Sequence, residues 1–301
     1  MNTQNLQKIL GQMTLPFAVD KVDVFRMKRE EDGSDYDVWR IRVTDRDFIL
    51  KQCAKSEFQT YSTFLAHSAP FAPELIGSAT VKRKRYILIE YIQGENLCKS
   101  TRPKLKSALD SLICAQRKFL GATEYVACCI SYPKHRKRVL RRRKYLDTPA
   151  EKSAYSLFLQ VYDAAPHTLC HDDLLPFNII CAADRAVMID WEACGLLPCY
   201  LPLARLIAHG EEDPDALFFM TETDKIFAIN YYFEHFIKSL GIGYDDYRHA
   251  FDCFLFYEYC EWVYVGNRHH AKDGKYYQRY SIIAQDAAER LLRGERLTLR
   301  L

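Results

Sequence analysis

Long apolar runs, a secretory leader and paired metal-binding cysteines are all missing from the sequence. No window comes near the roughly 18 apolar residues that a membrane-spanning helix needs, so none is expected. The first residues hold no basic segment that leads into an apolar core, which predicts no signal peptide. The eleven cysteines are an odd number without a Cys-x-x-Cys pair, so neither a zinc site nor a disulfide framework is indicated. We expect most of them to be buried thiols in a reducing cytoplasm.

A strong charge of either sign and any repeat or low-complexity segment are also absent. The net charge is only +3, which is too small to indicate nucleic-acid binding. What is present is the composition of a globular protein with a core, with 49% hydrophobic and 27% charged residues. A chain of 301 residues is long for a single average domain and suits two lobes.

The clearest pattern is a β-hairpin in the second half of the chain. Two apolar runs, 177–181 and 186–189, flank a short polar segment, which is typical of a hairpin. Because a hairpin brings its ends together, one pocket could hold Asp173, Asn178 and Asp190. Oxygen ligands of this kind suit a hard cation such as Mg²⁺ beside phosphate groups. One of the carboxylates could instead position an attacking hydroxyl.

The same residues resemble a known family. The pattern His171-x-Asp173-x-x-x-x-Asn178, followed by an apolar strand that ends in Asp190, matches the catalytic and metal-binding loops of kinase-fold enzymes. The strand ends in Ile-Asp-Trp-Glu rather than Asp-Phe-Gly, and in this it is similar to the aminoglycoside phosphotransferase/choline kinase family. The alternative is a metal-free hairpin with incidental acids.

The resemblance implies a role for each polar residue of this loop. Asp173 would be the catalytic residue that orients the acceptor hydroxyl, and Asn178 and Asp190 would bind Mg²⁺. His171 belongs to the same catalytic motif, and we expect it to support the loop by hydrogen bonds rather than to act as an acid.

Two further acids of the same stretch keep open roles. Asp172 stands where the family commonly has glycine, so it either faces the substrate or is solvated. Glu192 follows two residues after Asp190, and it either supports the metal site or contacts the substrate.

The N-terminal part is predicted to be an antiparallel sheet with a helix. Alternating apolar residues predict strands over 22–27 and 36–43, and further strands are predicted over 48–50, 75–82 and 86–92. Helical spacing predicts helices over 3–13 and 56–66. The resemblance assigns Lys51 to the nucleotide phosphates and Glu57 as its partner on the helix. A solvated strand end is the alternative for Lys51.

The resemblance also implies nucleotide contacts in two loops. The turn that holds Gly33 and Ser34 should cover the phosphates, although a turn with one glycine is equally typical of a plain hairpin. The segment after the fifth strand, at Glu90 and Ile92, should be the hinge whose backbone pairs with adenine.

The remainder of the chain is predicted to be helical. Helices are expected over 104–119, 154–162, 201–208, 224–240, 244–264 and 276–292. Pro202 replaces an acid that related enzymes often carry before Leu-Ala. Glu258 and Trp262 share one helix face and could hold a quaternary ammonium group by cation–π attraction. The alternative for this aromatic tract is an ordinary buried helix.

A basic tract from Lys134 to Lys144 contains eight Lys or Arg residues. Either it binds an anionic partner, or it is a solvated helix face with Val139 and Leu140 turned inward. No long activation segment and no Ala-Pro-Glu follow Asp190, which favours a small acceptor over a protein substrate.

Together these patterns predict an α+β, bilobal protein kinase-like fold. Residues 1–93 would form an N-lobe with a five-stranded antiparallel sheet and a helix, and residues 94–301 a mainly helical C-lobe with the catalytic hairpin and the acceptor site. The resemblance implies a cytoplasmic enzyme that uses ATP and Mg²⁺ to phosphorylate a hydroxyl of choline, ethanolamine, an amino alcohol or a sugar. The composition predicts no membrane partner and does not favour a nucleic-acid partner. A pseudokinase or coat-type scaffold that kept the fold is the alternative.

Overall fold

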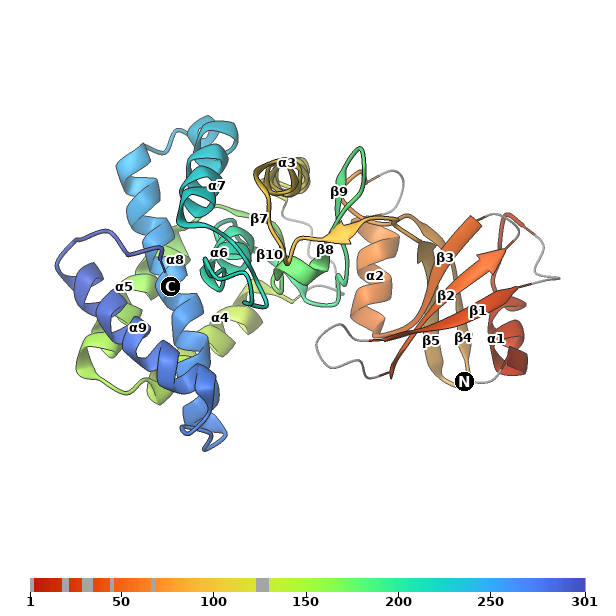
Figure 1. Cartoon of the computed structure of the whole chain (residues 1–301), viewed down its shortest axis with the longest axis horizontal. Helices are drawn as coiled ribbons and strands as arrows, with labels where there is room; N and C mark the ends of the chain where they lie inside the picture. The colour runs from red at the N-terminus through yellow and green to blue at the C-terminus, as the bar shows by residue number, and fades with distance from the viewer. Residues whose placement is uncertain are drawn as a thin grey trace.

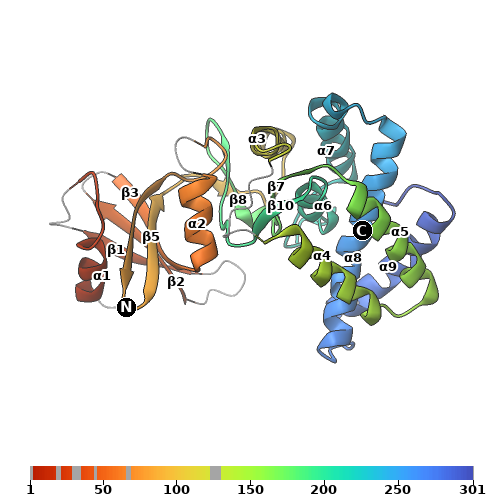
Figure 2. The same cartoon turned by 180° about the vertical axis from the view of Figure 1, so that it is seen from behind.

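The structure is a computed structural model of the chain, and it describes residues 3–17, 22–28, 35–43, 46–65, 69–122 and 130–300. A sheet part and a helical part lie side by side along the longest axis (Figure 1). The view from behind shows the same two parts, with the N-terminus in the sheet part and the C-terminus among the helices (Figure 2).

The sheet part contains five strands and two helices. They are α1 (Thr3–Leu10), β1 (Asp23–Lys28), β2 (Asp35–Val43), β3 (Arg46–Cys53), α2 (Lys55–Thr63), β4 (Leu75–Val81) and β5 (Lys84–Glu90). The strands are all antiparallel and lie in the order β1-β2-β3-β5-β4. The predicted five-stranded antiparallel sheet with a helix after its third strand is therefore confirmed.

Alternation along β3 determines which side chains point toward the helical part. Phe48 and Leu50 are buried on one face, in a small core that they share with Leu6 of α1. Because successive strand residues point to opposite faces, Ile49 and Lys51 lie on the other face. They line the cavity between the two parts of the molecule.

A small second sheet joins the sheet part to the helical part. It is formed by β6 (Glu95–Asn96), β8 (Ile179–Cys181) and β9 (Ala186–Met188), in that order. A Cβ atom on Gly94 would lie 2.4 Å from the carbonyl oxygen of Cys181, so the close approach of the two backbones requires glycine. The lobe boundary at residues 93–94 falls just before β6 and stays a prediction.

The helical part contains the remaining elements. They are α3 (Arg102–Lys118), α4 (Tyr132–Arg142), η1 (Arg143–Tyr145), α5 (Pro149–Ala164), β7 (His167–His171), η2 (Pro176–Asn178), β10 (Cys194–Pro198), α6 (Leu201–Ala208), α7 (Glu222–His235), η3 (Ile237–Leu240), α8 (Tyr244–Arg268) and α9 (Lys275–Leu292). None of the helices in the described ranges has the length and hydropathy that a membrane crossing requires.

One strand pair in this part was not predicted from the sequence. β7 and β10 are antiparallel, and His171 lies opposite Cys194 in their register. The amide of Asp172 extends the pairing by donating to the carbonyl of Ala193, at 2.8 Å. The loop that begins at His171 is thus anchored to the chain that follows the hairpin, on the side away from β8.

The buried face of α4 differs from the predicted one. Val139 is buried as expected, but Leu140 is 45% exposed, so the prediction that both turn inward is wrong. Neighbouring residues of a helix point about 100° apart, and the side chains that share the face of Val139 lie three or four positions away. These are His135 and Arg142, and both are buried.

Candidate active site

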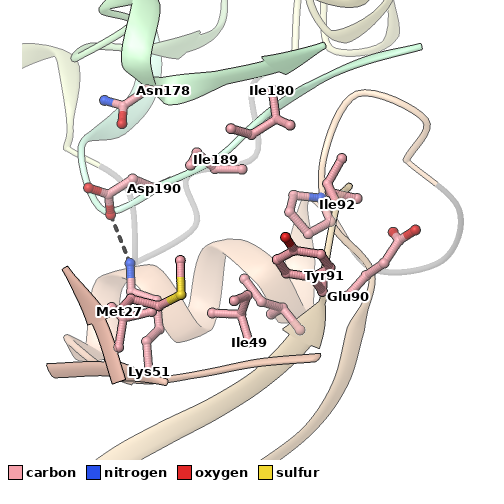
Figure 3. A pocket seen from close by; sticks show the side chains of 13 residues that line it. Met27, Ile49, Lys51, Glu90, Tyr91, Ile92, Asn178, Ile180, Ile189 and Asp190 are labelled. Carbon is pink, nitrogen blue, oxygen red and sulfur yellow. Dashed lines mark hydrogen bonds and ion pairs between the residues drawn. The ribbon is translucent and has the colours of Figure 1, made fainter. Parts of the chain in front are cut away.

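A cavity of about 190 Å³ lies between the sheet part and the helical part. Its walls are mostly apolar, with Met27 and Ile49 from the sheet facing Ile180 and Ile189 from the hairpin (Figure 3). One end is polar, and it is formed by Lys51, Asn178 and Asp190. Figure 3 shows the segment of Glu90, Tyr91 and Ile92 at the opposite end.

Lys51 forms two ion pairs at the polar end of the cavity. Its Nζ lies 2.7 Å from Oε1 of Glu57 and 2.8 Å from Oδ1 of Asp190. Burial opposes the charge on Lys51, but the two carboxylates outweigh burial and raise its pKa. Burial likewise works against the charge on Asp190, and Lys51 outweighs it and lowers the pKa of Asp190. Both groups are therefore charged at neutral pH.

The hairpin holds Asp190 in an unusual backbone conformation. The φ angle of Asp190 is +61°, which is uncommon for a residue other than glycine and recurs at functional sites. The residue before it is fixed on both sides, because the amide of Ile189 donates to the carbonyl of Asn178 and its carbonyl accepts from Nε2 of His171, at 2.9 and 2.8 Å. Burial lowers the pKa of His171, so the ring is neutral and donates through Nε2.

Oxygen ligands for a cation meet at the same end. One carboxylate oxygen from each of Glu57, Asp190 and Glu192 can lie within 4.8 Å of the others. Asn178 also faces the cavity, and its Nδ2 donates to the carbonyl of Asp173 at 2.8 Å, which leaves its amide oxygen available. Carboxylate and amide oxygens are the ligands that Mg²⁺ prefers, so these residues fit such an ion.

The backbone carbonyl of Asp173 is tied to this end through Asn178, and its carboxylate is bound by an arginine of α6. Nη2 of Arg205 donates to Oδ1 of Asp173 at 2.9 Å. The neighbouring Asp172 turns the other way, toward α4, where Oδ1 lies 2.9 Å from Nε2 of His135 and Oδ2 accepts from Arg138. Burial works against a charge on Asp172, but His135 and Arg138 outweigh it and hold its pKa below the ordinary range. Asp172 is therefore neither solvated nor directed at the cavity.

Two of these partners were missed by the reasoning from sequence. Arg205 lies on a helix that was predicted correctly, but nothing in its local pattern indicates that it reaches Asp173. His135 was assigned no role from the sequence, although helical spacing puts it on one face with Val139 and Arg142. That spacing was a usable signal for a buried polar face.

The other predicted nucleotide contacts have different outcomes. Gly33 and Ser34 lie outside the described residues. Glu90 and Ile92 line the cavity. The carboxylate of Glu90 accepts a hydrogen bond from Nη2 of Arg185 at 2.8 Å. This contact links the segment after β5 to the hairpin of β8 and β9.

A second cavity, of about 470 Å³, opens beside Arg205 in the helical part. Aromatic and charged side chains share its lining; they are Phe177, Phe218, Trp262, Tyr276, Tyr280, Arg205, His209, Lys275, Arg279, Glu211, Asp213 and Asp215. Of the two α8 residues predicted to contact the acceptor, Trp262 is in this lining. Glu258 is not; it is 3% exposed and accepts from Nη1 of Arg205 at 2.9 Å.

Solved structures of similar fold are small-molecule kinases. A choline kinase from Cryptosporidium parvum Iowa II has a TM-score of 0.64 at 13% identity, with 97% of each chain covered. A thermostable mutant of aminoglycoside phosphotransferase APH(4)-Ia, in a ternary complex with AMP-PNP and hygromycin B, has a TM-score of 0.58 at 14% identity, covering 96% of this chain and 97% of that one. Choline kinase LicA from Streptococcus pneumoniae has a TM-score of 0.53 at 15% identity, covering 90% and 95%. At these identities the likeness establishes the kinase-like fold.

The family itself is established by sequence. No curated protein matches the chain significantly. A model of the phosphotransferase enzyme family matches residues 27–225, about two thirds of the chain, and this match covers both sides of the first cavity. The resemblance inferred from the hairpin motif is thereby confirmed, and the chain belongs to the phosphotransferase enzyme family.

Proposed function

We propose that the protein is an ATP- and Mg²⁺-dependent kinase that transfers the γ-phosphate to a hydroxyl of a small molecule. Membership of the family and the kinase-like fold support a small-molecule phosphotransferase. The observation that carries the finer proposal is the ion-paired group of Lys51, Glu57 and Asp190 at the polar end of an otherwise apolar cavity.

The first cavity would bind the nucleotide. Its apolar walls suit a purine ring, and the backbone at Glu90 and Ile92 would pair with the edge of the ring. The charged ammonium of Lys51 would bind the phosphates at the other end, with Glu57 holding it in place. The turn at Gly33 and Ser34 would cover the phosphates.

The proposed chemistry is supported by the bond from Asn178 to the backbone of Asp173, which ties Asp173 to that polar end. The acceptor oxygen would bond to the γ-phosphorus while the bond to the β–γ bridging oxygen breaks, so that ADP leaves and the hydroxyl proton passes to Asp173. Asn178 and Asp190 would hold Mg²⁺, which supplies charge neutralisation at the phosphate oxygens. Glu192 would support that ion, and His171 would keep the loop in place.

The acceptor would bind in the second cavity. Trp262 stacks on Tyr276 with 4.5 Å between ring centroids, a surface suited to an ammonium group or to a sugar ring. The three acids of this lining are matched by three Lys or Arg residues, so the cavity is less acidic than a polycation such as an aminoglycoside would favour. Choline, ethanolamine, another amino alcohol or a sugar fits this mixture better.

The test is ADP release from Mg-ATP with a panel of hydroxyl acceptors, accompanied by thermal-shift measurements of nucleotide binding. We expect Mg-ATP to raise the melting temperature, and Asp173→Asn to lower kcat by about 100-fold or more while leaving that rise intact. Asp163→Asn is the matched control, because Asp163 also pairs with an arginine but belongs to α5 and not to the loop that holds Asp173. No thermal shift and no ADP release with any acceptor would reject the enzyme in favour of a scaffold.

The outer face of α4 suggests an anionic partner in addition. Lys134, Lys137 and Arg141 are exposed and form no ion pair with any residue in the described ranges. They line a hollow on the surface together with Arg138. Attraction at such a surface is screened by salt, so a partner bound there should dissociate as ionic strength rises.

A further inference from the structure

Arg205 connects the carboxylate of Asp173 to two glutamates of α8. Beyond its bond to Asp173, its Nη1 donates to Oε2 of Glu258 at 2.9 Å and to Oε2 of Glu261 at 3.3 Å. The side chain of Arg205 is only 17% exposed, and that of Glu258 only 4%. A guanidinium is planar and rigid, so contacts at both of its ends fix where the Asp173 oxygen lies.

The contact uses only one oxygen of Asp173. Oδ1 accepts from Arg205, whereas Oδ2 accepts no hydrogen bond from any residue in the described part of the chain. The side chain of Asp173 is 43% exposed, so this second oxygen is accessible to a ligand. Arg205 also lines the second cavity, so the guanidinium lies where the proposed acceptor site meets the proposed catalytic residue.

Glu261, one of the two glutamates that hold Arg205, is itself held from α4. Nη1 of Arg142 donates to Oε2 of Glu261 at 3.0 Å and to the hydroxyl of Tyr257 at 2.7 Å. A continuous series of ion pairs thus runs from Arg142 through Glu261 and Arg205 to Asp173. Burial acts against the charge on Arg205, but Glu258, Glu261 and Asp173 outweigh it and keep its pKa raised.

We propose that Arg205 is a positioning residue for phosphoryl transfer, which holds one oxygen of Asp173 so that the other faces the acceptor hydroxyl. This inference depends on the proposed function, since it assigns Arg205 a part in the same reaction. A guanidinium that served stability alone would need only the two glutamates. The third contact, to the exposed Asp173, adds little to stability because surface ion pairs are weak. Its consequence is the fixed direction of the carboxylate.

The decisive experiment separates kcat from KM in two variants. Arg205→Lys keeps the charge but cannot bridge Asp173 and Glu258 with one rigid group, and we expect kcat to fall about 10- to 100-fold with KM for ATP unchanged. The double variant with Arg205→Gln and Glu258→Gln removes one buried positive charge and one buried negative charge. Neither residue then leaves an unpaired buried charge behind, so we expect the fold to be retained. This double variant should lose kcat to the same extent or more, relative to Glu258→Gln alone.

Arg136→Lys is the matched control, because Arg136 binds Asp163 through two nitrogens without any contact to Asp173. It should leave kcat within about twofold of the wild type, since exposed ion pairs contribute little. The proposal is overturned if the folded double variant keeps the kcat of Glu258→Gln, or if KM for ATP rises in step with the loss of kcat.

A second measurement needs no activity. A double-mutant cycle in urea unfolding with Arg205→Gln and Asp173→Asn should show the small coupling expected of a partly exposed ion pair, and strictly additive effects would overturn the contact itself. Failure of the proposed function would look different. The wild type would then release no ADP with any acceptor, and the cycle would still decide whether Arg205 holds Asp173.

Discussion

Replacing Asp172 by asparagine tests whether α4 holds the loop that begins at His171 by charge. Its carboxylate is 9% exposed and binds His135 and Arg138 together. Asparagine keeps the shape and removes the charge, so two charge-assisted contacts are lost from a buried position. The side chain of Arg138 is 43% exposed, so water can solvate its charge once Asp172 is replaced. This solvation limits the loss of stability. We therefore expect the free energy of unfolding to fall by about 2 kcal/mol at pH 7.

The pKa of Asp172 determines the direction in which this loss of stability changes with pH. The pKa of Asp172 is lower in the folded chain than in the unfolded chain, so its contribution is complete above about pH 5 and declines as the pH falls through and below the ordinary aspartate value of about 3.9. Between pH 7 and pH 3 the gap between wild type and Asp172→Asn should narrow by about 1 kcal/mol, as protons bind the unfolded chain.

Urea unfolding at pH 7, 5 and 3 measures that gap, and Asp163→Asn is its control. Asp163 also binds an α4 arginine through two oxygens, but both side chains are more than a third exposed. Its substitution should cost about 0.5 kcal/mol, because an exposed pair gains little over hydration. Equal losses for the two variants, or a gap for Asp172→Asn that does not change with pH, would refute the reasoning.

Three other substitutions test the site and its frame. Lys51→Met should lower kcat about 100-fold in the ADP-release assay and cost about 3 kcal/mol in urea, because Glu57 is left buried without its partner; an unchanged kcat would contradict its role. Gly94→Ala should cost about 2 kcal/mol, because its methyl group would meet a backbone carbonyl of β8, whereas Gly243→Ala, with only an ordinary contact, should be nearly neutral in the same assay. Trp262→Ala should raise KM for the acceptor about 10-fold and leave KM for ATP unchanged, and the reverse pattern would move the acceptor elsewhere.

The features that were predicted correctly from the sequence depend on local spacing. The apolar segment 48–50 predicted β3, and in the structure the two-residue period of the strand places Phe48 and Leu50 on one face and Ile49 and Lys51 on the other. The hairpin was also predictable from local sequence, because two short strands joined by a tight turn pair antiparallel to each other. Of the three residues predicted to share one pocket, Asn178 and Asp190 line the first cavity, whereas Asp173 is not in its lining.

The features that were missed depend on partners far apart in the chain. β7 and β10 pair across an intervening hairpin, and neither strand alternates clearly, because both are largely buried on their two faces. Glu258 was considered as a substrate contact because it shares a face with Trp262. Its partner is Arg205, 53 residues earlier, and helical periodicity gives no information about such a contact.

The basic tract shows why counting charges could not assign its role. Its cations divide by helical face rather than acting as one block. His135 and Arg138 bind Asp172, and Arg142 reaches Asp173 through Glu261 and Arg205, so the inward side holds both carboxylates of the catalytic loop. In the described part of the chain, the outward Lys134, Lys137 and Arg141 have no ion-pair partner and can meet an anionic partner, while Arg138 borders both sides. Substitutions on the two faces should therefore differ in kind. Inward changes should alter stability and kcat, whereas outward changes should alter only salt-dependent binding.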